Sequence, residues 1–142
     1  MRVLLDTNVL VSAFIRREGC SARILAAWYT DRYVLVTSRH IVDELCRVSR
    51  YPRVVKRLGE RDQDLINLIE EMERAAPEPA PRYDCQVLAD PDDNAVLAAA
   101  VGGHADYLVT GNKHHFDELG GTHEGIEILS PREFWERLES EA

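Results

Sequence analysis

The chain has 142 residues, a length that predicts one domain, residues 1–142, with enough chain to bury a hydrophobic core. Its hydrophobic residues (45%) and charged residues (30%) occur in the proportions of a soluble globular protein, and its apolar stretches are too short to cross a bilayer, so we expect no membrane partner. The net charge of −8 argues against a protein that covers its whole surface with basic residues to bind nucleic acid.

Cysteine usage predicts reduced thiols. The three cysteines, Cys20, Cys46 and Cys85, are odd in number and widely spaced, and they include no CxxC pair. This pattern argues against a disulfide framework and against a zinc site. The first residues run directly into an apolar segment that ends at Asp6, which is unlike a secretory signal. We therefore expect a cytoplasmic protein.

The first part of the chain predicts a strand, a helix and a second strand. Residues 3–5 are a short apolar run typical of a buried parallel strand, and the polar residues 6–8 interrupt its apolar continuation. Ser21 is the expected cap of a helix with apolar side chains at the helical spacing. Residues 33–36 predict the second strand.

Two amphipathic helices are expected next. Ser38 caps the first of them, which ends before Pro52 because the residue preceding a proline disfavours the helical conformation. The second carries apolar side chains at helical spacing from Leu65 to Met72. The turn-rich stretch "PEPAP" at 77–81 ends it.

The last part of the chain predicts two strands between two helices. Asp90 in "DPDD" is the expected cap of a short, Ala-rich helix. Residues 107–109 and 126–129 predict the strands. Ser130 caps the final helix, and Glu133 completes a capping box three residues later.

The alternation of strands and helices predicts an α/β fold, a three-layer α/β/α arrangement with a mostly parallel central sheet. In such sheets the functional cleft lies at the carboxyl ends of the strands. Asp6, residues 37–38 and residues 110–112 each follow a predicted strand directly. We therefore expect these polar residues to gather at one edge of the sheet.

Asp6 is the first of these residues to need an explanation. Removing a carboxylate from water at the end of a buried strand costs several kcal/mol, unless something compensates for the lost hydration. Either it caps the start of a turn or helix, or it faces a bound cation. The sequence around it allows both interpretations.

Other acidic residues can be sorted by the helix face they occupy. At 100° per residue, Glu44 falls on the border of the apolar face of its helix, whereas Asp43 points away from it. Asp93 occupies the third position of the helix that Asp90 caps. The alternative for Asp92 and Asp93 is structural, because acids in a first turn are stabilised by the helix dipole.

Taken together, Asp6, Glu44 and Asp93 come from three separate segments that meet near one edge of the sheet. Grouped carboxylates raise one another's pKa unless a cation lies between them. Oxygen ligands suit Mg²⁺ or Mn²⁺, and such an ion can promote hydrolysis of a phosphodiester without a nucleophilic Ser or Cys. The set therefore favours a metal-dependent phosphodiester hydrolase.

A basic stretch lies within this acidic chain. Residues 39–61 carry seven basic and three acidic side chains, a net charge of +4, which leaves −12 on the remainder. Such a stretch can hold a phosphate backbone. A solvated helical face is the alternative.

Four motifs follow one another along the chain: "LLDTNVLVSA", the Glu in "TSRHIVDEL", "DPDDNAVLAAA" and "ADYLVTGNKHHF". In this order they resemble the PIN-domain family, and most closely its VapC-like toxins of toxin–antitoxin systems. The resemblance implies a Mg²⁺- or Mn²⁺-dependent endoribonuclease, commonly a homodimer, that an antitoxin protein neutralises. It makes Arg47, Arg50, Arg53 and Lys113 candidates to hold RNA phosphates.

The resemblance also assigns roles to individual residues. Asp6 matches the first metal ligand, Glu44 the second and Asp93 the third, with Asp92 as an alternative register. Asn8 and Thr110 match polar residues that the family places beside the first Asp.

The chain departs from the family at the fourth acidic position, which falls in "TGNKHHF". Many relatives have an Asp at the place of Asn112 or of His115. Asn112 can bind a metal through its carbonyl oxygen or through water, but with less charge, so we expect one hydrated ion. Phosphate contacts near the cleft are the expected role of His114 and His115. An alternative function follows: a catalytically weak or inactive PIN-like module that binds RNA.

Overall fold

Five strands form one sheet in the order β2-β1-β3-β5-β4 in the computed structural model of the chain, which describes residues 1–75 and 85–141. The parallel strands are β1 (Arg2–Leu5), β2 (Val34–Val36), β3 (Tyr107–Val109) and β5 (Ile126–Leu129). The short strand β4 (Thr122–His123) runs antiparallel to β5 at the sheet edge. The expected mostly parallel sheet is confirmed.

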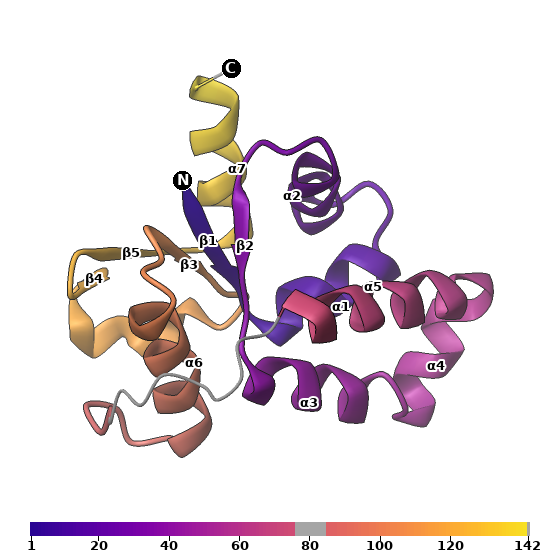
Figure 1. Ribbon diagram of the computed structural model, residues 1–142, viewed down its shortest axis with the longest axis horizontal. Coiled ribbons are helices and arrows are strands. Elements are labelled where there is room, and N and C mark those ends of the chain that lie inside the picture. Colours follow the sequence, from indigo (N-terminus) through magenta and orange to yellow (C-terminus); the bar gives the residue numbers. More distant parts are fainter. Residues whose placement is uncertain (76–84, 142) are drawn as a thin grey trace.

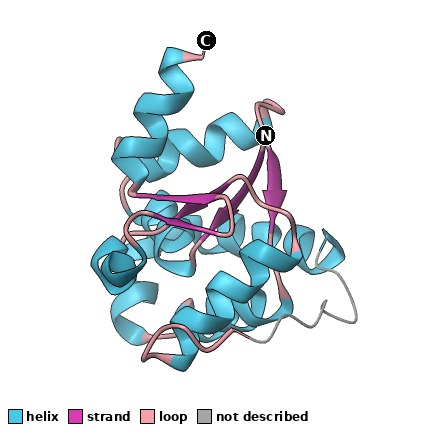
Figure 2. Ribbon diagram, turned by 90° about the vertical axis from the view of Figure 1, so that its left-hand side faces the viewer, coloured by secondary structure: helices cyan, strands magenta, loops and turns pink. Residues whose placement is uncertain are grey.

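Helices cover the sheet on both sides, as Figures 1 and 2 show, so the expected three-layer α/β/α fold is confirmed. The α-helices are α1 (Thr7–Ile15), α2 (Cys20–Tyr29), α3 (Arg39–Val48), α4 (Pro52–Leu58), α5 (Asp62–Ala75), α6 (Pro91–Gly102) and α7 (Pro131–Ser140). Two 3-10 segments, η1 (Gly59–Arg61) and η2 (Lys113–Leu119), complete the connections. Helix α6 packs against β1 and β3, and α7 packs against β5 and α2.

Three of the predicted helix caps are confirmed. Ser38 accepts a hydrogen bond from the Ile41 amide at the start of α3, and Asp90 accepts one from the Asp92 amide at the start of α6. Ser130 forms a complete capping box with Glu133. Each cap satisfies amide groups that the first helical turn leaves without a partner.

The predicted start of α2 is wrong. The helix begins at Cys20, and Gly19 holds the extended capping conformation, so Ser21 lies buried inside the first turn instead of capping it. Helices α1 and α4 and strand β4 were not expected from the sequence. The stretch at 77–81 that was expected to end α5 lies outside the described residues.

Aromatic packing joins α7 to the sheet. Phe134 is fully buried, and its ring lies 5.6 Å from that of Tyr107 in β3 and 5.7 Å from that of Tyr33, measured between centroids. The Tyr33 hydroxyl donates to the Ile24 carbonyl in α2. Burial of these large side chains fixes α2 and α7 on one layer. Among the described residues, no helix is both long and apolar enough to cross a membrane.

Candidate functional site

The register of the sheet brings the residues that follow β1 and β3 side by side. Leu5 lies opposite Val109, and the Asp6 amide continues the ladder by donating to the Val109 carbonyl at 2.9 Å. Asp6 and Thr110 therefore occupy the next row, beyond the ends of both strands. Their side chains meet there: the Thr110 hydroxyl donates to Asp6 Oδ2 at 2.9 Å.

Asp6 caps α1, and its carboxylate is almost fully enclosed. Its side chain is only 7% exposed, and Oδ1 accepts from the Thr7 amide at 2.8 Å. Oδ2 accepts from Thr110 and, at 3.4 Å, from the Asn8 side-chain amide. The capping interpretation of Asp6 is thus confirmed, and these hydrogen bonds compensate part of the cost of burying it.

A close backbone approach holds Asn8 in place. The Gly111 amide donates to Asn8 Oδ1 at 2.7 Å, and a Cβ atom at position 111 would lie 3.0 Å from that same oxygen. The Asn112 amide donates to the Thr110 hydroxyl at 3.1 Å. Two hydrogen bonds therefore join the loop after β3 to the start of α1: one from Thr110 to Asp6 and one from Gly111 to Asn8.

The pKa values of two carboxylates show that acidic residues converge here. Burial raises the pKa of Asp6, and the nearby Asp93 carboxylate raises it further, against the hydrogen bonds from Thr110 and Thr7. Burial also raises the pKa of Glu44, and Asp6 and Asp92 add to the effect. Repulsion of this kind arises where carboxylates lie close together in a poorly solvated place. Acidic residues from the end of β1, from α3 and from α6 thus face one region.

Exposure distinguishes the inward acids from their neighbours. In α3 the Glu44 side chain is 24% exposed and Asp43 is 68% exposed. In α6 the Asp93 side chain is 16% exposed and Asp92 is 68% exposed. The helical-wheel prediction for α3 is confirmed, and of the two acids in the first turn of α6, Asp93 faces inward.

Two histidines contact these acids. His40 Nε2 lies 3.6 Å from Glu44 Oε2 and 3.8 Å from Asp92 Oδ1, so it bridges α3 and α6. His115 Nδ1 lies 3.3 Å from Asp93 Oδ2. The sequence analysis did not single out His40, although its position four residues before Glu44 on one helix places both on the same face.

A pocket of about 380 Å³ opens beside Glu44. It lies between α1, α3, α4 and the loop that carries Asn112. Its lining residues are Thr7, Asn8, Val11, Ser12, Ile15, Arg16, Glu44, Val48, Arg57 and Asn112. The site thus brings Glu44, Asn8 and Asn112 to one opening.

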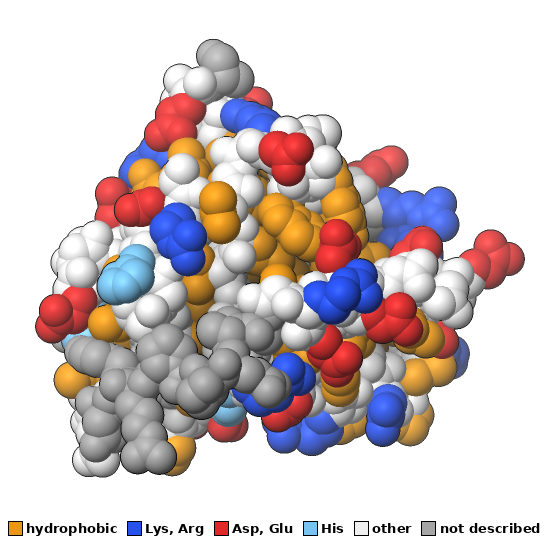
Figure 3. Space-filling model, viewed as in Figure 1, with side chains coloured by type: hydrophobic (Ala, Val, Ile, Leu, Met, Phe, Trp, Pro, Cys, Tyr) orange, Lys and Arg blue, Asp and Glu red, His pale blue; other side chains and the backbone are white. Residues whose placement is uncertain are grey.

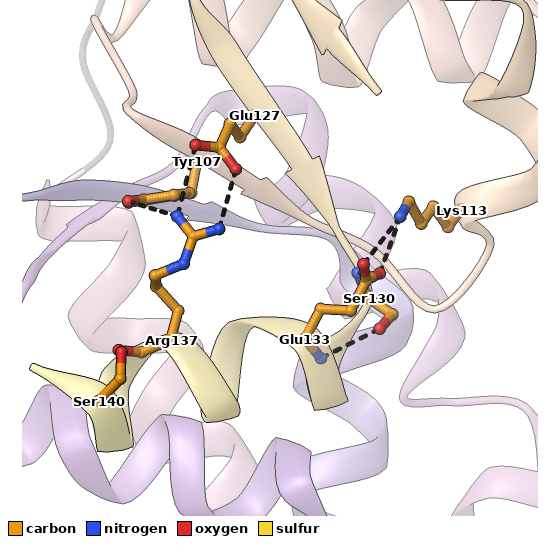
Figure 4. A network of polar contacts seen from close by, with 7 residues as sticks. All are labelled: Tyr107, Lys113, Glu127, Ser130, Glu133, Arg137 and Ser140. Atoms are coloured by element: carbon orange, nitrogen blue, oxygen red, sulfur yellow. Dashed lines mark hydrogen bonds and ion pairs between the residues drawn. The ribbon is translucent and has the colours of Figure 1, made fainter. Parts of the chain in front are cut away.

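The basic residues predicted to hold phosphates lie outside this pocket. Arg47, Arg50 and Arg53 are exposed, and on the face shown in Figure 3 the Lys and Arg side chains over α3 and α4 are interspersed with acidic ones. Lys113 is engaged elsewhere: its ammonium group donates to both oxygens of Glu133 in α7, at 2.8 and 3.1 Å (Figure 4). The two pocket arginines, Arg16 and Arg57, were not selected by the sequence analysis.

The donors at this edge of the sheet fit a hydrated Mg²⁺ or Mn²⁺ ion. They are carboxylate, amide and hydroxyl oxygens, and Mg²⁺ is usually held by one or two carboxylates while water fills the rest of its shell. The described residues contain no group of three or more Asp, Glu, His or Cys side chains close enough to hold an ion directly. Asp6 and Asp93 are the pair best placed to hold such an ion, because each lies inward and Asp93 raises the pKa of Asp6.

Comparison with known proteins gives three similarities. A family described as "PIN domain" matches residues 2–114. The uncharacterized protein MJ1680 of Methanocaldococcus jannaschii is 24% identical over 146 aligned positions, which span 98% of this chain and 92% of that protein. A chain in the crystal structure of VapBC2 from Rickettsia felis, bound to a DNA fragment from their promoter, superposes with a TM-score of 0.54 at 16% identity, over 92% of this chain and 98% of that chain. The structural match shows a shared fold.

Proposed function

Because the chain belongs to the PIN-domain family, we propose that it is a metal-dependent endoribonuclease that hydrolyses RNA phosphodiesters at the edge of the sheet. Asp6, Glu44 and Asp93 are the proposed catalytic residues. Mg²⁺ or Mn²⁺ is the proposed cofactor.

One observation carries this proposal: acidic side chains from three separate segments converge at the carboxyl ends of β1 and β3, where, in addition to burial, Asp93 raises the pKa of Asp6 and Asp6 raises that of Glu44. Such a cluster is unfavourable in the absence of a cation, because each charge disfavours the others. A helix-dipole role alone would be served by exposed first-turn acids such as Asp92, whereas Asp93 is turned inward, where it contacts His115 and raises the pKa of Asp6.

We assign a separate role to each side chain of the site. Asp6 and Asp93 hold the ion, and Thr110 and Asn8 fix the orientation of the Asp6 carboxylate through the hydrogen bonds to Oδ2. Asn112 contributes a carbonyl oxygen through water. When bound, the ion polarises the phosphoryl oxygen and lowers the pKa of water. Glu44, at the boundary of the site and the pocket, accepts a proton from the attacking water.

The biological role proposed is that of the toxin of a type II toxin–antitoxin pair. The similarity in fold to a chain of VapBC2 from Rickettsia felis supports this assignment. The proposed toxin role implies two further features. An antitoxin protein blocks the site, and the chain is located in the cytoplasm. A homodimer is the proposed assembly.

A second candidate is a PIN-like module that binds RNA without cleaving it. The observation that favours it is Asn112, which stands at a position where many relatives carry an acid, together with the absence of a direct three-residue metal cluster among the described residues. This candidate predicts RNA binding that no divalent ion converts into cleavage.

The experiment that separates the two is RNA cleavage by the purified chain with Mg²⁺, with Mn²⁺ and with EDTA, on single-stranded and structured RNA. We expect cleavage that requires a divalent ion and disappears in Asp6→Asn. Asp93→Asn and Glu44→Gln should each lower the rate by ~10²-fold or more, in the range of removing one electrostatic or proton-transfer group.

The chain offers a matched control for each of these two variants. Asp92→Asn and Asp43→Asn remove exposed carboxylates from the same turns of α6 and α3, and we expect each to lower the rate by less than about threefold. If wild type and Asp6→Asn give the same products, or if EDTA leaves cleavage unchanged, the nuclease proposal is wrong.

A further inference from the structure

The pocket beside Glu44 is not needed to hold a metal ion, and its composition points to a different ligand. It runs along one face of α1, whose side chains at 7, 8, 11, 12, 15 and 16 line it. From Asn8 to Arg16 the helix rises ~12 Å, at 1.5 Å per residue. The pocket therefore reaches from the carboxylates at one end of α1 to positive charge at the other.

Three apolar side chains line the pocket between its polar ones: Val11 and Ile15 of α1 and Val48 of α3. Its volume of about 380 Å³ falls in the range of small-ligand sites, ~300–1,000 Å³. A planar, uncharged ring system fits such walls better than a charged group does.

Two arginines that line the pocket have no acidic partner among the described residues: Arg16, at the C-terminal end of α1, and Arg57 of α4. Arg16 and Arg57 are both exposed, and neither forms an ion pair within residues 1–75 and 85–141. By contrast, Arg137 and Lys113 each pair with a glutamate. Two unpaired guanidinium groups at one opening form a site for an anion, since Arg binds phosphate oxygens through its planar set of donors.

We propose that this pocket binds the nucleotide next to the scissile phosphodiester of a single-stranded RNA, with its base between Val11, Ile15 and Val48 and its outer phosphate on Arg16 and Arg57. The proposal rests on the ribonuclease function proposed above. It selects single-stranded RNA because a base must leave its stack to enter the pocket.

The test measures binding separately from cleavage. Fluorescence anisotropy of a labelled single-stranded RNA decamer, in EDTA, compares wild type with the double variant Arg16→Gln/Arg57→Gln. Arg17→Gln, which removes the exposed neighbouring charge outside the pocket, is the control. We expect the double variant to weaken binding by ~10-fold or more, and to reduce the slope of log K against log salt by ~0.7, since the two arginines share one phosphate and each phosphate contact on a single strand contributes ~0.7.

A second measurement tests the base contact. Decamers with one abasic position, moved along the strand, should show a single position where wild-type binding falls by ~5-fold or more, because the base loses its burial against apolar side chains, and burying an apolar group of that kind contributes ~1.5–3 kcal/mol. In Ser12→Phe, whose added ring occupies the middle of the pocket, we expect this sensitivity to disappear. Circular dichroism confirms that the variants are folded.

The outcomes separate the two proposals. Metal-dependent cleavage with binding unaffected by the arginine double variant would refute the pocket assignment and leave the nuclease intact. Pocket-dependent binding without any cleavage would refute the nuclease and support the pocket only as a nucleotide site of a module that binds RNA without cleaving it. Equal loss of affinity in Arg17→Gln would mean that only general surface charge is involved, and no measurable RNA binding by wild type would overturn the pocket assignment. Either of these last two results, the equal loss in Arg17→Gln or the absence of RNA binding, excludes the pocket as a nucleotide site.

Discussion

The ion pair between Lys113 and Glu133 gives a prediction whose size and pH dependence follow from the structure (Figure 4). Glu133 accepts from Lys113 and from the Ser130 amide, and these contacts lower its pKa from 4.5 to about 2. The change to test is Glu133→Gln. A glutamine amide can still accept from Ser130 and complete the capping box, but it removes the charge that pairs with Lys113.

Solvent screening reduces the contribution of this ion pair to the free energy of unfolding. The shift in pKa would correspond to ~3 kcal/mol if it were expressed in full. The Glu133 side chain is 44% exposed, however, and exposed ion pairs contribute only ~0.2–1 kcal/mol. A first-turn carboxylate adds ~0.3–1 kcal/mol through the helix dipole. We therefore expect Glu133→Gln to lower the free energy of unfolding by ~1 kcal/mol at pH 7.

The sign of the pH dependence follows from the lowered pKa. The folded state holds Glu133 charged more strongly than the unfolded state does, so the contribution is fully present above about pH 4.5 and is lost as the pH falls toward about 2. Urea unfolding followed by circular dichroism at pH 7, 4.5 and 3 measures it. The difference between wild type and Glu133→Gln should shrink steadily from pH 4.5 to pH 3.

The matched control is Glu136→Gln, one turn further along α7. Among the described residues, Glu136 pairs only with the exposed Arg132, at 3.3 Å, and we expect a change below ~0.5 kcal/mol. Equal effects of the two substitutions at pH 7 would refute the reasoning. So would a Glu133→Gln deficit that stays constant down to pH 3.

Three further substitutions test the packing around the site. Thr110→Val keeps the shape but removes the buried donor to Asp6, and it should cost ~2 kcal/mol in urea unfolding, the value of a hydrogen bond to a charged group. Gly103→Ala should cost ~1–3 kcal/mol, because its Cβ would lie 2.3 Å from Val36 Cγ1. Phe134→Ala empties a fully buried site and should cost ~3–5 kcal/mol, seen as a large fall in melting temperature. A loss below ~0.5 kcal/mol in any of the three would contradict the packing described.

The sequence by itself determined the elements that local signals mark. Strands β3 and β5 match the predicted ranges 107–109 and 126–129, and the capping box at Ser130 begins α7 as expected. Capping depends on residues three apart, so a single window of sequence contains it. The helical wheel likewise placed Glu44 inward and Asp43 outward, because side-chain direction repeats every 3.6 residues.

Helix α1 was missed because its sequence lacks a helical signature. Its residues 7–15, "TNVLVSAFI", are apolar almost throughout and include β-branched side chains, and most of them are buried. A short apolar run of this kind reads equally as a buried strand or as a buried helix. The burial of α1 against α2 and α3 decided its conformation.

The site itself was decided by contacts between residues far apart in the chain. Sheet register places Thr110 on Asp6, 104 positions away, and helix packing places His115 on Asp93 and Arg57 across a pocket from Arg16. The sequence supplied the acidic residues and the succession of strands and helices along the chain. It could not supply which side chains meet, because that depends on how parallel strands pair and how helices pack over them, and neither is encoded within any local window.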